Sequence, residues 1–239
     1  MNGSTIFLNN IAYVWPALLL GALVPCGVLL TLFFSKKKKE IAFKSALHGF
    51  GTFFVVLAAV AILLLVISQI FLSNVTVSAE SDANTYIYVG GGIVLLLFWL
   101  ISELLKVISF DAIQKTEKTE QAGLTFGSGF ILAQNFLIFG LISIGEIDMS
   151  HSLAFGLLML FSGVIYILIS AVGYQLSREK QRYAGAAIAI SYFLLFAVML
   201  FFSNVYITYG FIAAVLVFNL VVAYITLPLP FKKKKEGSV

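Results

Sequence analysis

The chain has 239 residues, of which 61% are hydrophobic and only 11% are charged, and its mean hydropathy is +1.04. An ordinary soluble domain is about a quarter charged, so this composition excludes a water-soluble fold. The single cysteine, Cys26, excludes an internal disulfide and a cysteine-rich metal site, and the net charge of +4 needs no nucleic acid as a partner.

Seven apolar segments recur along the chain, each long enough to cross a hydrocarbon core of about 30 Å at 1.5 Å per residue. No basic residue precedes the first of them, so we predict a retained helix rather than a signal peptide. The sequence therefore predicts an all-α, polytopic membrane protein that forms a single domain over residues 1–239. Its expected transmembrane helices span residues 11–34, 45–72, 87–108, 121–144, 153–176, 184–202 and 210–227.

The charged residues orient these helices. All fifteen Lys and Arg residues fall on one side of the predicted bundle, at positions 36–39, 44, 106, 115, 118, 178, 180, 182 and 232–235. The opposite side carries Glu80, Asp82, Glu146 and Asp148 and no basic residue. Because basic residues concentrate in cytoplasmic loops, we predict an outside N-terminus and a cytoplasmic C-terminus. The short polar tails and Lys-rich loops fit a multi-pass protein of a bacterial plasma membrane.

Ionisable residues are costly inside a bilayer, which makes each one a functional candidate. Glu103 lies on the third predicted helix, and Lys106 follows on the same face. We interpret them as an ion pair that snorkels to the cytoplasmic interface. His48 and His151 lie at opposite membrane edges, too far apart to share a metal ion. The sequence therefore predicts neither a metal site nor a cofactor, and no hydrolase motif of the GxSxG or HExxH type occurs.

The fourth predicted helix, AGLTFGSGFILAQNFLIFG, is the most unusual segment. Gly123 and Gly127 form a GxxxG spacing, and Gly129 follows, which predicts that another helix approaches closely. Gln134 and Asn135 lie near mid-membrane, where an amide without a hydrogen-bond partner is expensive. They are the best candidates for a polar cavity.

The segments FWLISELLKVISF and AGLTFGSGFILAQNFLIFG resemble the YhfC family of glutamic-type intramembrane peptidases, which belongs to the CPBP superfamily and is similar to the Aph subunit of gamma-secretase. The segment SREKQRYAGAAIAISYFLLF resembles the basic loop and sixth helix of the Aph subunit. Seven helices and an outside N-terminus agree with that resemblance. It implies a site on the third and fourth helices in which carboxylates activate water.

This chain departs from the family pattern at the decisive positions. The glycines Gly127 and Gly129 match it, and Glu103 stands at one of two expected glutamates. The substituted positions are Ser102 for the other glutamate, Lys106 for arginine, Phe130 for histidine, Gln134 for a later glutamate and Tyr192 near an expected histidine. Glutamine cannot take a proton from water as a carboxylate does, and phenylalanine offers no lone pair. The resemblance therefore implies a relative that has lost catalysis, a pseudoprotease.

Four functions fit these observations. The first is a non-catalytic scaffold or binding subunit for another integral membrane protein or a lipid-embedded segment, with its contact faces at the fourth-helix glycines and around Glu103. The second is a transporter or a small-molecule or lipid carrier, with Gln134, Asn135 and Asn219 lining a midplane cavity. The third is an active intramembrane protease in which Glu103 and His48 face one cavity. The fourth, a seven-helix receptor, has only its topology in favour.

Overall fold

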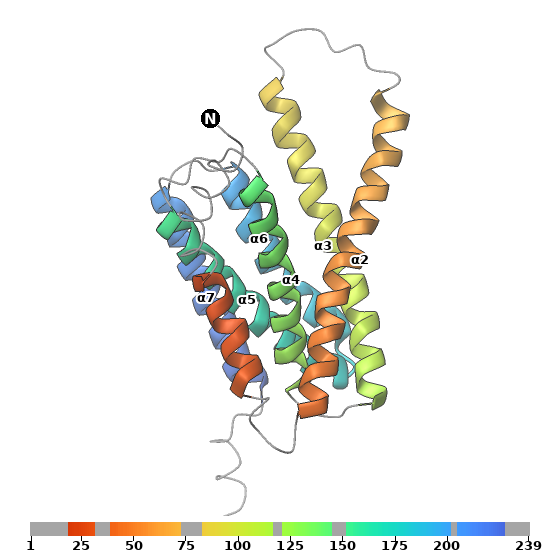
Figure 1. The fold of residues 1–239 in the computed structure, drawn as a ribbon, viewed down its shortest axis with the longest axis vertical. Coiled ribbons are helices and arrows are strands. Elements are labelled where there is room, and N and C mark those ends of the chain that lie inside the picture. The colour runs from red at the N-terminus through yellow and green to blue at the C-terminus, as the bar shows by residue number, and fades with distance from the viewer. Residues whose placement is uncertain are drawn as a thin grey trace, which may run out of the picture.

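The computed structural model describes residues 19–31, 39–72, 83–116, 121–144, 152–201 and 205–227, and nearly all of these residues form helices (Figure 1). No strand occurs within those ranges, so the all-α prediction is confirmed there. The elements are a helix at Leu19–Thr31, then α2 at Lys39–Leu72, α3 at Ala83–Thr116, α4 at Ala122–Ile144, α5 at Ser152–Arg178, α6 at Arg182–Phe201 and α7 at Val205–Thr226.

Several helices extend beyond the apolar stretches that predicted them. The second begins at Lys39 rather than residue 45, the third covers 83–116 rather than 87–108, and the seventh begins at Val205 rather than residue 210. Apolar residues mark where a helix is buried in lipid or protein, whereas backbone hydrogen bonding continues through the polar residues that follow. The extension of α3 brings Asp111 to Arg182 at the start of α6, where their side chains form an ion pair at 2.8 Å. Residues 11–18 and 32–34 of the first expected helix lie outside the described ranges.

Within the part of the chain that the structure describes, four helices are long and apolar enough to cross a membrane, at Phe43–Ile67, Gly90–Lys115, Gly156–Arg178 and Ile207–Thr226. Three further apolar helical stretches are shorter, at Leu19–Thr31, Ala122–Ile138 and Arg182–Leu195. Large apolar side chains point outward from several helices, as Leu65 of α2, Leu104 of α3 and Ile225 of α7 do, each more than 60% exposed. Apolar surface of this extent indicates contact with lipid rather than water.

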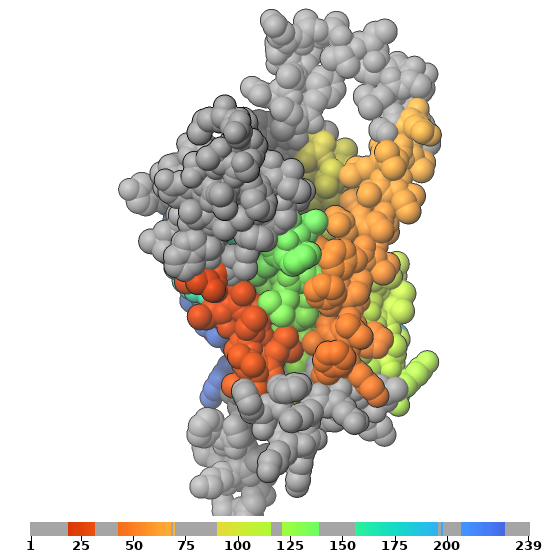
Figure 2. Space-filling view, in the orientation of Figure 1, coloured from red at the N-terminus to blue at the C-terminus, as the bar shows by residue number. Residues whose placement is uncertain are grey.

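Helix α4 lies at the centre of the bundle. It packs against α2 on one face and α5 on another, and Figure 2 shows it between α2 and the helix Leu19–Thr31 on the viewed face. Within 122–135 only Leu124, Leu132 and Gln134 are not fully buried. A helix that is apolar all round and enclosed on several sides is typical of the core of a bundle.

Glycines bring α4 into near-backbone contact with both neighbours. A Cβ atom at Gly129 would collide with the backbone of Ala46 in α2, and one at Gly49 would collide with the backbone of Phe126 in α4. On the other side, a Cβ at Gly123 would lie 2.6 Å from Tyr174 Cβ of α5. A Cβ at Gly127 would lie 2.9 Å from Ser170 Cβ, which also belongs to α5. The GxxxG spacing therefore serves a contact inside this chain.

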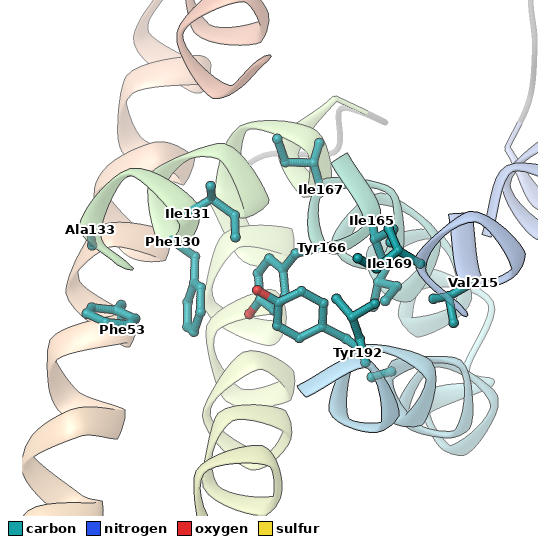
Figure 3. Packing of buried hydrophobic residues seen from close by; sticks show 13 residues of the cluster. Phe53, Phe130, Ile131, Ala133, Ile165, Tyr166, Ile167, Ile169, Tyr192 and Val215 are labelled. Atoms are coloured by element: carbon teal, nitrogen blue, oxygen red, sulfur yellow. The ribbon is translucent and has the colours of Figure 1, made fainter. Parts of the chain in front are cut away.

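A row of aromatic rings crosses the bundle and forms its core (Figure 3). Phe53 of α2 meets Phe130 of α4 edge to face with 5.2 Å between ring centroids. Phe130 stacks on Tyr166 of α5 at 4.5 Å, and Tyr166 meets Tyr192 of α6 at 4.9 Å. Offset and edge-to-face contacts of this kind contribute about 0.5 to 1.5 kcal/mol each beyond area burial. The row thus ties four helices together at one depth.

The C-terminal half of α2 and the N-terminal half of α3 stand apart from this core (Figure 1). None of residues 61–67 of α2, and none of residues 90–101 of α3, is buried, whereas both helices have buried residues in their other halves. The two helices pack together near Thr52 and Ser109, whose hydroxyl oxygens are 3.0 Å apart. From that contact the two helices diverge (Figure 1).

Candidate functional site

A half-enclosed cavity of about 240 Å³ lies where the diverging helices meet the core. Five helices line it, and most of its wall is aromatic or aliphatic. The lining residues are Phe53 and Leu57 of α2, Val94, Leu95, Phe98, Trp99, Ser102 and Glu103 of α3, Gln134, Leu137 and Ile138 of α4, Tyr166 of α5, and Tyr192 and Phe193 of α6. An apolar pocket with a few converging polar groups is the usual form of a ligand site.

The polar end of the cavity is formed by an ion pair on α3. Lys106 Nζ lies 2.5 Å from Glu103 Oε1, and the side chains are only 2% and 9% exposed. The expected pairing is present, but the expected snorkelling is wrong, because Lys106 is among the largest fully buried side chains. Helix α3 turns this face toward the core rather than toward the membrane surface.

Tyr166 covers the buried ammonium group. Lys106 Nζ lies 5.7 Å from the centroid of the Tyr166 ring, within the range of a cation–π contact. The ammonium group is thereby held between a carboxylate and an aromatic face, which offsets part of the cost of burying its charge. The cavity wall itself presents Glu103 and Tyr166, with Lys106 behind them.

Two more polar side chains face each other across the cavity. Tyr192 of α6 donates a hydrogen bond to Gln134 Oε1 of α4 over 3.3 Å. Three buried atoms of other lining residues have no hydrogen-bond partner in the described part of the chain: Glu103 Oε2, the Tyr166 hydroxyl and Trp99 Nε1. Each of these three atoms exposes less than 1 Å² of surface, so the wall that a ligand would meet in the cavity is almost entirely apolar.

The other amides proposed for a cavity do not reach it. Asn135 is buried on a different face of α4, where its Nδ2 atom would lie 3.0 Å from a Cβ at Gly21. Asn219 of α7 donates hydrogen bonds to Ser191 Oγ at 3.1 Å and to the carbonyl of Val215 at 2.9 Å. The expectation that Asn135 and Asn219 line the cavity with Gln134 is therefore wrong, and both serve helix packing.

The pairing required of an active protease is not assembled either. His48 is exposed and lines a separate groove between α2 and α3, together with Thr52 and Ser109. Glu103 lies on the wall of the central cavity. The two residues that an active protease would use thus face different spaces. His151 lies outside the described residues, and among those that the structure describes no group of three or more His, Cys, Asp or Glu residues could hold a metal ion.

The glycines proposed as a contact face for another protein are covered by this chain itself. Gly123 and Gly127 lie against α5, and Gly129 lies against α2. All three are buried, so none is available to a partner helix without opening the bundle.

The positions that the family resemblance singles out do come together. Glu103, Gln134 and Tyr192, from three different helices, line one cavity. Phe130 stacks on Tyr166 beside them. The arrangement brings one carboxylate to the cavity, already paired with Lys106, and brings no second acid and no histidine. Its one carboxylate, that of Glu103, is held by Lys106, and its other groups can accept and donate hydrogen bonds.

Two polar residues of the lining, Tyr166 and Trp99, were not singled out by sequence reasoning. Tyr166 lies near the middle of α5, and Trp99 lies one helical turn before Glu103 on α3. The signal was a polar aromatic side chain placed mid-helix, far from the interfaces where Tyr and Trp usually gather in membrane proteins.

No protein-family model matches the chain, and searches of curated proteins and of solved structures found no significant match.

Proposed function

We propose that this chain is a non-catalytic integral membrane protein of seven spans that binds the apolar part of a lipid-like molecule in the central cavity. The observation that carries the proposal is the cavity itself, whose wall is largely aromatic and aliphatic and whose one polar end is a neutralised ion pair. A binding or carrier role needs only this apolar wall and the ion pair, and it needs no further acid or base. It also agrees with the loss of acid and base residues implied by the resemblance to intramembrane peptidases.

Size favours a lipid chain over a protein segment. A helix with its side chains is about 10 to 12 Å across, which a cavity of about 240 Å³ cannot admit. A hydrocarbon chain or a single ring does fit. The lining residues of α3 run from Val94 to Glu103, which corresponds to about 14 Å along the helix. This stretch of α3 runs from the polar end of the cavity toward the diverging parts of α2 and α3, where we expect lipid to enter the cavity from the side.

A photolabelling experiment tests the proposal. Full-length protein in phosphatidylcholine vesicles is irradiated with a long-chain alkyl diazirine, and labelled residues are mapped by mass spectrometry. We expect labels on Glu103, Tyr166 and Tyr192, whose burial keeps them from lipid outside the bundle. The variant Leu95→Phe places a larger side chain in the cavity and should lower this labelling by about ten-fold, which corresponds to about 1.4 kcal/mol of binding free energy.

Leu96→Phe is the matched control, because Leu96 is the next residue on α3, is 43% exposed and does not line the cavity. Its labelling pattern should equal that of the unaltered protein. Labels confined to outward residues, or an equal response to both substitutions, would show that the cavity takes no lipid chain.

The topology belongs to the same proposal. The 23 residues of α4 and the 20 of α6 correspond to about 34 and 30 Å, enough to span the hydrocarbon core alongside the four longer apolar helices. These are six spans, and the seventh is the expected helix at residues 11–34, of which the structure describes Leu19–Thr31. Together with the one-sided placement of Lys and Arg, they support seven spans with an outside N-terminus in a plasma membrane.

Cysteine labelling checks that orientation. In a Cys26→Ser background, Ser81→Cys should react with a membrane-impermeant maleimide added to intact cells, because residue 81 lies in an expected outer loop. Ser238→Cys should react only after the membrane is permeabilised. Labelling of the Ser238→Cys variant in intact cells would show that the C-terminus lies outside, which contradicts the predicted orientation.

A further inference from the structure

We propose that the central cavity takes one acyl chain of a membrane lipid, methyl end first, from the leaflet in which α2 ends and α3 begins, while the head group stays at the membrane surface. By the predicted orientation this is the outer leaflet. The inference rests on the proposed function, and it adds the leaflet, the number of chains and the direction in which the chain lies. It follows from the depth of the lining residues, their exposure and the dimensions of the cavity.

The polar end of the cavity lies at the middle of the membrane-spanning helices. Glu103 is next to the midpoint of the span Gly90–Lys115 on α3, and Tyr166 is next to the midpoint of Gly156–Arg178 on α5. Tyr192 is likewise next to the midpoint of α6. Helices that cross the same hydrocarbon core have their midpoints at similar depths. These three residues therefore end the cavity near the mid-plane of the bilayer.

From the mid-plane the cavity extends toward one face of the membrane only. Helix α3 begins on the side where α2 ends, and α4 ends on that side too, because consecutive spans cross in alternate directions (Figure 1). The aliphatic part of the lining follows the mid-plane residues of α2 and α4 and precedes Glu103 on α3, so all of it lies toward that side. It includes Leu57 of α2, Val94, Leu95 and Phe98 of α3, and Leu137 and Ile138 of α4.

Exposure shows which end of the cavity is closed. The six residues just named are all partly exposed, whereas Glu103, Tyr166 and Tyr192 are 7%, 3% and 7% exposed. In the same direction, none of residues 61–67 of α2 and none of residues 90–101 of α3 is buried. A chain can therefore enter from that leaflet and ends among the three buried residues.

The closed end suits a methyl group better than a head group. Glu103 Oε2 and the Tyr166 hydroxyl each expose less than 1 Å² of surface, and Gln134 Oε1 already accepts the hydrogen bond of Tyr192. A head group placed there would lose its hydration without gaining these atoms as partners, which is costly. A methyl group has no hydration to lose, and in this direction the head group remains at the membrane surface.

The dimensions match a single chain of one leaflet. From Val94 to Glu103 the cavity follows α3 for about 14 Å, close to half of the hydrocarbon core of about 30 Å. Spread over that length, the volume of about 240 Å³ gives a mean width of roughly 5 Å, and nonbonded carbon atoms in contact are already about 3.5 to 4.0 Å apart. One chain fits, and two chains side by side do not. A two-chain lipid would leave its second chain in the bilayer.

Two photoactivatable phosphatidylcholines test the direction of the chain in the full-length protein. One carries a diazirine at the methyl end of an acyl chain, and the other carries it beside the carbonyl group of that chain. We expect the methyl-end probe to label Tyr166 and Tyr192 at least about ten-fold more than the carbonyl-end probe, as for two orientations whose populations differ by an order of magnitude. Leu104 is the internal control, because it lies next to Glu103 but is 64% exposed, and the methyl-end probe should label it from the surrounding lipid.

Two further measurements use the methyl-end probe. Probes with phosphatidylcholine, phosphatidylglycerol and diacylglycerol heads should label Tyr166 and Tyr192 equally, because the head group stays outside the cavity. Phosphatidylcholine probe introduced into the outer leaflet of right-side-out membranes should label these residues more than probe introduced into the cytoplasmic leaflet of inside-out membranes. Leu95→Phe should lower the labelling of Tyr192 and keep that of Leu104, whereas Leu96→Phe should keep both.

The outcomes separate this inference from the function on which it rests. Equal labelling by the two positional probes, or stronger labelling by the carbonyl-end probe, would overturn the direction of the chain and leave a lipid-binding cavity. A strong preference for one head group, or stronger labelling from the cytoplasmic leaflet, would also overturn the inference. Labels on Leu104 with none on Tyr166 or Tyr192 from either probe would overturn the proposed function itself.

Discussion

Gly49→Ala should be strongly destabilising, with the free energy of unfolding reduced by at least about 1 to 3 kcal/mol, the range for forcing an extra carbon atom into a packed interior. The added Cβ would collide with the backbone of Phe126, and a flexible side chain cannot move aside there because the obstacle is a main-chain carbonyl. Helices α2 and α4 must then separate. Gly129→Ala should act in the same way from the opposite side, against the backbone of Ala46.

Gly51→Ala is the matched control, two residues further along α2. Nothing lies within 4 Å of a Cβ built at Gly51, so this variant should be as stable as the unaltered protein or slightly more stable, since Ala is the better helix former. Thermal unfolding in detergent, followed by size-exclusion chromatography with fluorescence detection, measures both. Equal behaviour of Gly49→Ala and Gly51→Ala would mean that α2 and α4 are not in backbone contact.

Lys106→Met should be the most damaging single change in the site, with a cost of about 3 to 5 kcal/mol, because it leaves the Glu103 carboxylate buried without its counter-charge. Glu103→Gln should be similarly costly because it strands the ammonium group. The combined variant Glu103→Gln/Lys106→Met should recover much of the loss, since a buried ion pair replaced by neutral residues of similar volume is often near neutral.

A double-mutant cycle on thermal stability measures this coupling. The exposed pair of Asp111 and Arg182 offers the comparison, because its side chains are 36% and 50% exposed and such pairs contribute about 0 to 1 kcal/mol. Additive effects of Glu103→Gln and Lys106→Met, with no recovery in the combined variant, would contradict a buried pair.

The lengths of the apolar segments predicted the helices well. The positions of the polar residues within them predicted the site only in part. The segment around Glu103 and Lys106 is apolar on every side, so nothing in its pattern distinguishes a pair that points into the bundle from one that points to the interface. Burial of the pair follows from where α5 and α6 pack, with Tyr166 over the ammonium group. That information belongs to tertiary structure and is not carried by the local sequence.

Helix geometry explains which features of α4 were correctly predicted. Successive residues turn by about 100°, so Gly127 and Gly129 point to nearly opposite sides and serve two different neighbours. The GxxxG spacing alone indicated a single close neighbour. The same geometry separates Gln134 from Asn135, which is why one reaches the cavity and the other lies beside Gly21. Neighbouring residues on a helix therefore need not line the same space, although Ser102 and Glu103 of α3 both do.

The near-backbone contact at Gly49 and Gly129 holds α2 and α4 at a fixed separation in that part of the bundle. Residues 61–67 of α2 and 90–101 of α3 include no buried residue, so these parts of the two helices are freer to move than the contact is. Entry of a lipid to the proposed site should therefore depend on how far these parts of α2 and α3 spread apart. Their spread depends on the thickness of the leaflet around them, because helices tilt to match the hydrocarbon they cross. Exchange of a bound lipid should accordingly become faster or slower with the acyl-chain length of the surrounding membrane, without any change in the binding groups.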